Sequence, residues 1–547
     1  MRTVSVFKNN NANKGIEIIG LTDEENNFVN NSAIQLSLQI HKKHSLIFYK
    51  KLDITSVLQI DLYFLFRKVL KIEILAKKIN KYNHNTNVFL EDLKEIQLLQ
   101  YFLKHNSIKV KYQRNDFFDI KQAVKQHYLE GISKISMYQL KSLFKKKSLP
   151  FVNSTSKKVL SFYEVNNNSM TNILKNITCE IDNAETFYSN EGIKNKLAQD
   201  KEQVTNMYSL LKFKDIYSFF NNKELTSYNQ FKVSFKKALE DLFDNKYIRD
   251  VLLKDCFKIY NFMYYSLTIE ARCFERLLDT GAYHSVIMSS DSHKSSRLLA
   301  LIAKDLKVKT FVIQHGTVGE LAFTPIYAYR FCAWGEIPKQ QLIEFGEDPS
   351  KITITGNPVI SNPIPERVIK SKDLNILVAT NPIGKGNLIE FLDLIMQALQ
   401  QSNFEYELKI RLHPGEDNKE LIQGVMDNSR VIYSFDDNQM LKDSIEWSDL
   451  VVVSNSTVGI EALFHNRKLI VVDLGVKVPM FIPYEQYKAA PMPSTVYEIL
   501  NEMKSIRDGI DEYDGRDLVK KYLGSSMGQE SIRDIVQLVE GLENETY

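Results

Sequence analysis

The chain is short of cysteine, with four such residues in 547: Cys179, Cys256, Cys273 and Cys332. They are scattered, without a CxxC pair and without the mixed His and Cys spacing of a zinc site. This excludes a small scaffold held together by disulfides, and we expect mostly buried thiols in a reducing compartment. We expect neither a metal nor a cofactor.

Long apolar runs are also missing, because no stretch reaches the roughly 18 residues that a membrane span needs. The first 15 residues contain no apolar segment of the kind found in a signal peptide. The net charge of +3 does not favour nucleic acid as a partner. We therefore expect a cytoplasmic protein. The basic run Leu143–Leu149 suits the anionic face of the inner membrane, but a solvated helix end is the commoner meaning, so peripheral membrane contact stays open.

The length predicts two or three domains, and 44% hydrophobic with 25% charged residues is typical of globular proteins. Strand-like and helix-like runs alternate through the C-terminal half, which indicates an α/β fold with parallel sheets. The Pro-rich, charged stretch Ser361–Lys372 separates two such series and predicts a linker. We predict an N-terminal accessory α/β region (1–150) and two Rossmann-like domains (151–365 and 366–547) that face a cleft.

The predicted strands of the first Rossmann-like domain are Lys158–Tyr163, Ser285–Met288, Lys309–Ile313, Phe331–Trp334 and Ile352–Thr355. Those of the second are Asn375–Thr380, Glu407–Leu412, Val431–Ser434, Leu450–Val453 and Lys468–Val472. The predicted helices are Met170–Ile177, Ser296–Leu306, Leu388–Gln400, Gln439–Trp447 and Gly459–Phe464. Residues 191–275 are predicted to be mostly helical, either as an insertion or as a helical face of the first Rossmann-like domain. The accessory region is predicted to hold strands Asn87–Leu90 and Ser107–Val110 around a helix at Lys94–Lys104.

Ligands of open parallel sheets bind beyond the carboxyl ends of the strands. After the predicted strand Leu450–Val453, the polar residues Ser454, Asn455, Ser456 and Thr457 lead directly into a helix. The N-terminus of that helix would bind an anion, and Glu461 inside it would accept from ribose hydroxyls. Plain N-capping by Ser456 or Thr457, with Glu461 as a favourable first-turn acid, explains the same residues.

Two histidines follow predicted strands, His315 in the first domain and His413 in the second. An imidazole there can donate to a phosphate or transfer a proton near neutral pH, and a structural histidine is the alternative. Gly384 and Lys385 form a short, cationic loop after another strand that could contact a diphosphate, although a surface turn is commoner. The acidic pair Asp436-Asp437 resembles a metal-binding pair, but we interpret it as a solvated loop.

These motifs resemble those of a group of bacterial transferases. VVVSNSTVGIEALFHNRKLIVVDLG is similar to the C-terminal signature of capsule polysaccharide biosynthesis transferases. RLHPGE resembles the His-Pro motif of those enzymes, of polysialyltransferases and of CDP-glycerol glycerophosphotransferases, and VIQHGTVGE resembles the His-Gly segment of the last group. ITGNPVI and the Ser-Gly-Glu helix also resemble non-hydrolysing UDP-N-acetylglucosamine 2-epimerases. The resemblance covers about residues 280–475.

There are two departures. Polysialyltransferases and many capsule transferases carry an acidic pair where this chain has Gln314-His315, and the epimerases carry Gly-Gly where it has Ser456-Thr457. The resemblance implies the GT-B fold, a catalytic base at His315 and a donor-phosphate contact at His413. It also implies phosphate or nucleotide contacts for Ser454, Ser456 and Thr457 and a ribose contact for Glu461.

We hypothesise a metal-independent GT-B glycosyltransferase of bacterial surface polysaccharide synthesis. It would transfer a sugar or polyol phosphate from a CMP-, CDP- or UDP-linked donor to a glycan or lipid-linked glycan. The base would be His315 or a nearby acid, Asp291 or Glu320. The alternatives are a sugar-nucleotide 2-epimerase and a non-catalytic partner in a glycan assembly complex.

Overall fold

The computed structural model describes residues 3–5, 16–18, 22–43, 59–79, 87–90, 110–112, 158–164, 168–189, 193, 197, 204–211, 222–360, 363, 373–413, 419–429, 431–436, 440–475 and 481–541. The basic run at 143–149, the predicted helix at 94–104, nearly all of the predicted linker and Asp437 lie outside these residues. Within them, no helix is long and apolar enough to cross a membrane. The chain divides into two compact units: Met1–Asn166, Glu185–Val286 and Asp291–Thr310 form one, and Asn167–Ala184, Ile287–Ser290 and Phe311–Tyr547 the other.

A five-stranded parallel sheet is formed by the C-terminal part of the chain, in the order β14-β13-β12-β15-β16. Its strands are β12 (Leu374–Ala379), β13 (Tyr406–Arg411), β14 (Ser434–Phe435), β15 (Leu450–Val453) and β16 (Lys468–Val471). The chain adds β13 and β14 on one side of β12 and then β15 and β16 on the other. This is a doubly wound sheet whose direction switches between β12 and β15.

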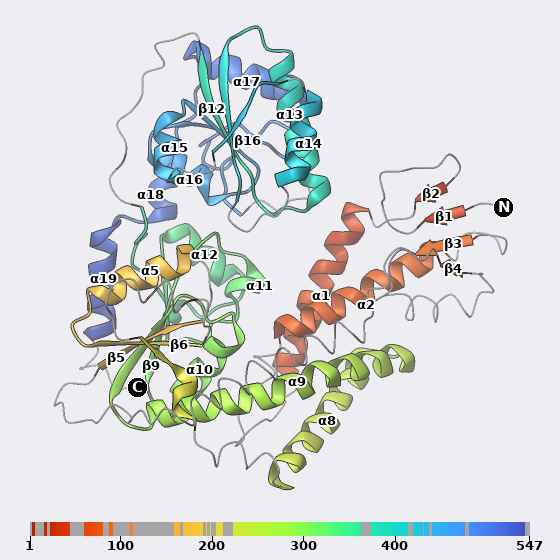
Figure 1. Ribbon diagram of the computed structural model, residues 1–547, viewed down its shortest axis with the longest axis vertical. Helices are drawn as coiled ribbons and strands as arrows, with labels where there is room; N and C mark the ends of the chain where they lie inside the picture. The colour runs from red at the N-terminus through yellow and green to blue at the C-terminus, as the bar shows by residue number, and fades with distance from the viewer. Residues whose placement is uncertain are drawn as a thin grey trace. The chain divides into compact units, whose positions relative to one another are not determined.

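Helices cover both faces of this sheet (Figure 1). On one face α13 (Lys385–Gln400), α14 (Lys419–Ser429) and α17 (Val496–Asp508) pack on residues such as Ile376 and Val452. On the other, α15 (Leu441–Trp447), α16 (Thr457–Phe464) and α18 (Arg516–Leu523) pack on residues such as Leu377 and Val451. Both faces of the central strands are therefore buried, which is why these strands read as unbroken apolar runs.

A second parallel sheet has seven strands, in the order β11-β10-β9-β8-β5-β6-β7. They are β5 (Lys158–Tyr163), β6 (Ala184–Tyr188), β7 (Val204–Asn206), β8 (Tyr283–Met288), β9 (Lys309–Ile313), β10 (Arg330–Ala333) and β11 (Ile352–Ile354). The associated helices are α5 (Asn168–Cys179), α10 (Lys294–Asp305), α11 (Glu320–Phe323) and α12 (Glu336–Glu344), with the short 3₁₀ turns Met207–Leu210 and Pro349–Lys351. This sheet is also doubly wound, and its direction switches between β5 and β8.

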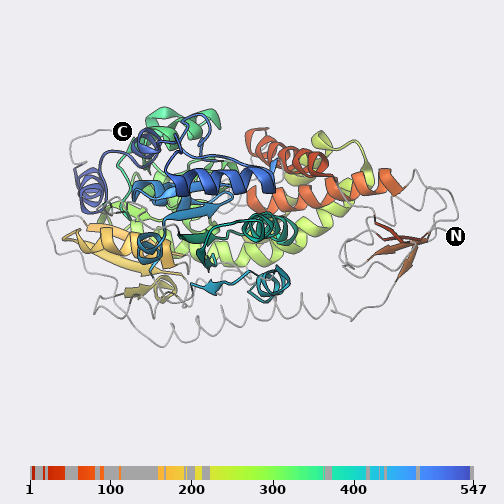
Figure 2. The same cartoon turned by 90° about the horizontal axis from the view of Figure 1, so that it is seen from above.

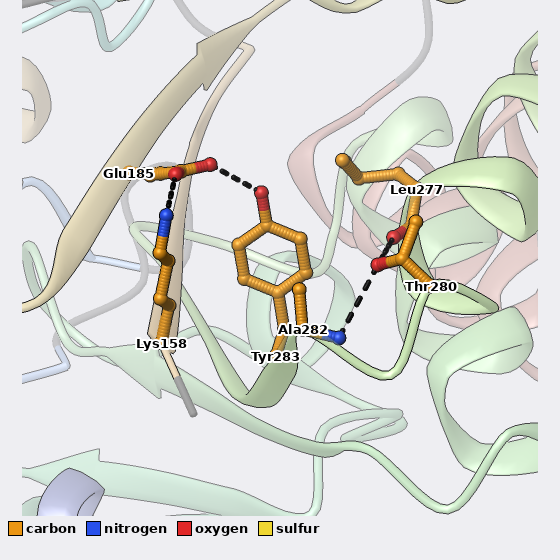
Figure 3. A network of polar contacts seen from close by, with 6 residues as sticks. All are labelled: Lys158, Glu185, Leu277, Thr280, Ala282 and Tyr283. Carbon is orange, nitrogen blue, oxygen red and sulfur yellow. Dashed lines mark hydrogen bonds and ion pairs between the residues drawn. The ribbon is translucent and has the colours of Figure 1, made fainter. Parts of the chain in front are cut away.

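A polar network joins three neighbouring strands at their amino ends (Figure 3). Glu185 of β6 forms an ion pair with Lys158 of β5 and accepts a hydrogen bond from the Tyr283 hydroxyl of β8. Burial and this carboxylate raise the pKa of Tyr283, so the phenol stays protonated. Thr280 accepts from the backbone N–H of Ala282 at 3.2 Å and closes the turn before β8. The network fixes the sheet at the edge opposite to the carboxyl ends of its strands.

The last turn of α18 and the segment after it lie directly against the carboxyl ends of β10 and β11. A Cβ on Gly356 would lie 1.8 Å from the Ser526 carbonyl oxygen, and one on Gly335 would lie 2.3 Å from that of Lys521. Asn357 accepts from Gly528 N at 2.8 Å and donates its own N–H to Ser526 O at 3.2 Å. The chain then continues into α19 (Gln529–Glu540), which contacts α5. The glycine of the ITGNPVI motif therefore permits a close backbone approach within the protein.

The N-terminal part contains a four-stranded parallel sheet with the order β2-β1-β3-β4. Its strands are β1 (Thr3–Ser5), β2 (Ile16–Ile18), β3 (Asn87–Leu90) and β4 (Val110–Tyr112). Two helices that the sequence did not predict, α1 (Asp23–Lys43) and α2 (Gln59–Ile79), pack on each other and on α8 (Asn222–Leu242) and α9 (Lys246–Leu278) (Figures 1 and 2). The rings of Phe66 and Phe243 meet in this helical layer at 5.6 Å between centroids.

The α/β fold class is confirmed. The seven-stranded parallel sheet precedes residues 355–373 in the sequence, and the five-stranded parallel sheet follows them. The domain boundaries at 150 and 365 stay predictions. The predicted strand Val431–Ser434 is wrong over most of its length, because β14 contains only Ser434 and Phe435 and Ile432 is 89% exposed. The sequence also missed the short strands β1, β2, β6 and β7.

Candidate functional site

The loops at the switch point of the five-stranded sheet are joined by one side chain, Asn381. This residue follows β12, and its Nδ2 donates to the carbonyl oxygen of Asn455 in the loop after β15. Its Oδ1 accepts from the hydroxyl of Ser454 at 2.8 Å, and Ser454 is 1% exposed. The motif at this loop predicted a ligand contact but no role for Asn381. Both loops are therefore held together at the place where doubly wound sheets bind ligands.

The loop after β15 ends in a capped helix. Ser456 is the N-cap of α16, and its hydroxyl oxygen accepts from the Val458 N–H at 3.3 Å. Thr457 is the first residue of the helix, two residues before the predicted start at Gly459. N-capping by Ser456 is thus confirmed. This capping hydrogen bond does not use the hydroxyl hydrogen of Ser456. It also does not use the N–H group at the very start of α16, and that N–H has no acceptor within the helix.

Gly459 in the same helix is required by packing. A Cβ there would lie 2.5 Å from the hydroxyl of Tyr484, a fully buried residue, and 3.2 Å from the side chain of Val453. The glycine in the Gly-x-Glu motif therefore lets α16 lie close to the sheet, which keeps its N-terminus beside the ends of β12 and β15.

The loop after β12 leads into the start of α13 rather than an ordinary turn. Gly384 is the N-cap, with φ of +90°, a conformation that favours glycine. Lys385 is the first residue of the helix, which begins three residues before the predicted Leu388. Lys385 is exposed, and no atom lies within 4 Å of a Cβ built on Gly384 or Gly386. This site therefore offers helix N–H groups and a cation in open space, which is suited to an anion.

Glu461 lies in the second turn of α16, so its interpretation as a first-turn acid is wrong, and the residue is partly buried. Burial raises the pKa of its carboxyl to about 7, and the positive charge of Arg411 opposes this shift. Arg411 ends β13 and donates to Asp436 at 2.7 Å and to Ser444 at 3.0 Å. Asp436 is 8% exposed and is the ion-pair partner of Arg411, so the interpretation as a solvated loop is wrong for this half of the acidic pair.

His413 lies just past the end of β13, and its side chain is exposed. Its backbone N–H donates to the hydroxyl of Thr380 at 3.2 Å, which joins the loop after β13 to the end of β12. The predicted donor-site residues therefore all follow the carboxyl ends of three adjacent strands, β13, β12 and β15. They are His413, Gly384, Lys385, Ser454, Asn455, Ser456, Thr457 and Glu461.

His315 follows β9 of the seven-stranded sheet and is partly buried. Its Nδ1 lies 3.0 Å from the carbonyl oxygen of Ser289, and its ring packs on Phe323 with 5.1 Å between centroids. A carbonyl oxygen only accepts hydrogen bonds, so Nδ1 must carry the proton in this contact. In the neutral ring Nε2 then carries the lone pair, which is the form a general base needs.

The two residues considered as alternative bases differ in how far they are buried. Asp291 is 2% exposed, and its backbone oxygen accepts from the Arg297 guanidinium at 2.9 Å. Glu320 is partly exposed and is the first residue of the short helix α11, with its backbone oxygen accepting from Thr324. The roles predicted for both side chains stay hypotheses.

At the switch point of the seven-stranded sheet, a carboxylate of the protein already occupies the helix start. Glu164 follows β5 and accepts from the backbone N–H of Ser295 at 3.0 Å and of Ser296 at 2.8 Å, in the first turn of α10. It also accepts from the Ser296 hydroxyl at 2.7 Å. Glu270 accepts from the Ser295 hydroxyl at 2.8 Å. This helix start is satisfied internally, in contrast to that of α13.

No protein-family model and no curated protein sequence matches the chain. Among solved structures it is similar to UDP-GlcNAc 2-epimerase from Neisseria meningitidis bound to UDP-GlcNAc, with 12% identity and a TM-score of 0.44 over 70% of this chain and 100% of that one. It is similar to the lipopolysaccharide outer core galactosyltransferase WaaB, with 13% identity and a TM-score of 0.44 over 71% and 99%. It is also similar to MurG from Acinetobacter baumannii, with 12% identity and a TM-score of 0.37 over 70% and 100%. Because these TM-scores are below 0.5, these similarities support no conclusion about the site, and the candidate site is defined by the side chains at the strand ends of the two sheets.

Proposed function

We propose that the protein is a GT-B glycosyltransferase of bacterial surface polysaccharide synthesis that uses a nucleotide-activated donor. The observation that carries this proposal is the pair of helix starts, α13 and α16, at the switch point of the five-stranded sheet. Two dipoles, backbone N–H groups and the Lys385 ammonium there suit the phosphates of a nucleoside diphosphate. Glu461 would accept from ribose hydroxyls, and His413 would donate to a phosphate oxygen.

The contrast with the seven-stranded sheet supports placing the donor on the five-stranded one. At the start of α10, Glu164 already accepts from the N–H groups that a phosphate would need. A second negative charge there would face a carboxylate and be repelled. The seven-stranded sheet is therefore assigned to the acceptor.

In the proposed reaction, the acceptor hydroxyl gives its proton to Nε2 of His315 while its oxygen forms a bond to the transferred sugar carbon or polyol phosphorus. The bond to the leaving phosphate oxygen breaks, and its electron pair stays on that phosphate. The starts of α13 and α16 and Lys385 would stabilise the charge that develops there, which is the usual means of catalysis without a metal. Asp291 and Glu320 remain the alternative bases.

The first experiment is a thermal-shift and calorimetry panel with CMP, CDP, UMP, UDP, GDP and dTDP. A nucleotide at 100 times its dissociation constant should add about 2.7 kcal/mol of stability. Lys385→Ala should weaken the best ligand about tenfold, or about 1.4 kcal/mol. Lys294→Ala is the matched control, because Lys294 is the first residue of α10 as Lys385 is of α13. Equal losses in the two variants would contradict the placement of the donor.

The second experiment separates the possible activities. The bound nucleotide identifies the donor series, which is incubated with and without glycan acceptors. Transfer that requires an acceptor supports the proposal. Isomerisation of the sugar nucleotide alone would show a 2-epimerase, and nucleotide binding without either reaction would favour a non-catalytic partner.

A further inference from the structure

Gln314 is a fully buried polar side chain next to the proposed base, and no sequence motif assigned it a role. It follows β9 and is 0% exposed. Its Nε2 donates to the carbonyl oxygen of Gly316 at 2.8 Å, and its Oε1 accepts from the backbone N–H of Trp334 at 2.8 Å. The Trp334 indole N–H donates to the Gln314 backbone oxygen at 3.1 Å.

The Gln314 amide therefore uses both of its ends. One end spans His315 to reach the carbonyl of Gly316, which closes the backbone around the histidine. The other end fixes this loop to the end of β10, the neighbouring strand. Buried amides are costly unless they are hydrogen-bonded, so this pairing resists any rearrangement of the His315 backbone.

The His315 ring is held separately, by the Nδ1–H bond to the Ser289 carbonyl and by the face of Phe323. The bond to Ser289 keeps its length only while the His315 backbone stays in place. We propose that Gln314 is a positioning residue: its amide fixes the loop so that His315 donates from Nδ1 and presents the lone pair of Nε2 to the acceptor. This inference rests on the proposed function for its catalytic meaning, whereas the tautomer can be measured without any substrate.

The position requires an amide. At a pH where the introduced carboxyl is ionised, it still accepts from the Trp334 N–H but has no hydrogen to donate, so it would place a negative charge beside the Gly316 carbonyl oxygen. Gln314→Glu should therefore release the loop, although it preserves the size of the side chain. Gln314→Met keeps a similar volume and removes both side-chain hydrogen bonds, which makes it the second variant.

The direct test is nitrogen NMR of the full chain labelled at its ten histidines, with the His315 signals assigned by their loss in His315→Gln. At a pH where the ring is neutral, we expect the wild-type proton on Nδ1. In Gln314→Glu and Gln314→Met we expect mixed tautomers and turnover lowered about 10–100-fold, since misplacement by about 1 Å can cost this much. Nucleotide affinity at the five-stranded sheet should not change. Gln340→Glu is the control, because Gln340 is exposed on α12 and donates to Glu344 at 3.3 Å.

Several results would overturn the inference. A wild-type proton on Nε2 would do so without any variant, even if both substitutions prevented folding. Folded Gln314 variants with wild-type His315 spectra and turnover would also do so. If the protein bound no nucleotide, the proposed function would be wrong instead, and the His315 tautomer would remain a structural result without a catalytic role.

Discussion

Replacing Glu461 with Gln should stabilise the ligand-free protein at alkaline pH and weaken its binding to a nucleotide. The carboxyl is largely removed from water in the second turn of α16, and its pKa is raised from 4.5 to about 7 by burial, against the opposing charge of Arg411. The neutral amide of glutamine has nearly the same shape and carries no charge to desolvate. The substitution should therefore change the free energy of unfolding and the nucleotide affinity in opposite directions.

The sign and size of the effect follow from proton linkage. Between pH 4.5 and about 7 the folded chain holds a proton on Glu461 that the unfolded chain has lost. The free energy of unfolding of the wild type therefore falls as the pH rises through this window, and levels off above it. At about 1.4 kcal/mol for each tenfold change in acidity constant, a pKa raised from 4.5 to about 7 costs about 3 kcal/mol. Glu461 is partly exposed, so solvent screening lowers this to about 2 kcal/mol.

Urea unfolding at pH 5 and pH 8 measures the effect. Glu461→Gln should be close to the wild type in stability at pH 5 and more stable by about 2 kcal/mol at pH 8. In calorimetry at pH 8, the same variant should bind the nucleotide about tenfold to a hundredfold more weakly, since a hydrogen bond to a charged group contributes about 1.5–3 kcal/mol. Glu446→Gln, on the exposed face of α15, is the control for a change of charge alone. A Glu461→Gln protein that is less stable than the wild type at pH 8, or that keeps full affinity, would refute the reasoning.

Three further predictions concern the proposed base, the loop after β15 and the close backbone approach at Gly356. His315→Ala should lower turnover about 10²–10⁴-fold and leave nucleotide affinity unchanged; a loss of affinity in calorimetry would instead make it a donor contact. Asn381→Asp should weaken nucleotide binding at least about tenfold, or about 1.4 kcal/mol, because it loses the donor that holds the loop after β15 and adds a negative charge beside the proposed phosphate site. Gly356→Ala should destabilise the fold by about 3 kcal/mol or more, because its Cβ would lie 1.8 Å from the Ser526 carbonyl oxygen. Gly346→Ala, also at positive φ but with no atom within 4 Å, should cost only about 1 kcal/mol in the same urea titration.

The sequence predicted the two larger sheets well because their central strands are buried on both faces. Lys158–Tyr163, Lys309–Ile313 and Leu450–Val453 match the structure residue for residue. Helix starts were predicted less well. The first residues of α13, from Lys385, are exposed and carry no apolar periodicity, so the pattern became visible only at Leu388.

The N-terminal part was harder to predict for two physical reasons. The strands β1 and β2 have three residues each, too few to show alternation between two faces. Helix α1 is rich in Asn, which favours caps and turns over helix interiors, and it is stabilised by packing on α2. Contacts between distant segments determine such elements, and a local pattern does not contain them.

The positions of the site residues could be predicted from the sequence, but their partners could not. Motifs at strand ends pointed to His315 and Glu461. The bond from His315 to Ser289 and the approach of Arg411 to Glu461 join residues that are 26 and 50 positions apart in the chain. The same is true of Asp436, which the sequence suggested to lie in a solvated loop and which is buried as the ion-pair partner of Arg411.

The two switch points differ in residue type rather than in fold, and this difference is why we propose the phosphate site on the five-stranded sheet. In each doubly wound sheet the first strand adjoins the fourth, and a helix starts after the fourth. After β5, the first strand of its sheet, the chain places Glu164, whose carboxylate reaches across to the helix after β8 and accepts from its N–H groups. After β12, in the equivalent place, it has Asn381, whose amide reaches across to the loop before the helix rather than to the helix itself. An acid at this place supplies the anion from within the protein, whereas an amide orders the loop, and under the proposed function the donor phosphate then supplies the anion.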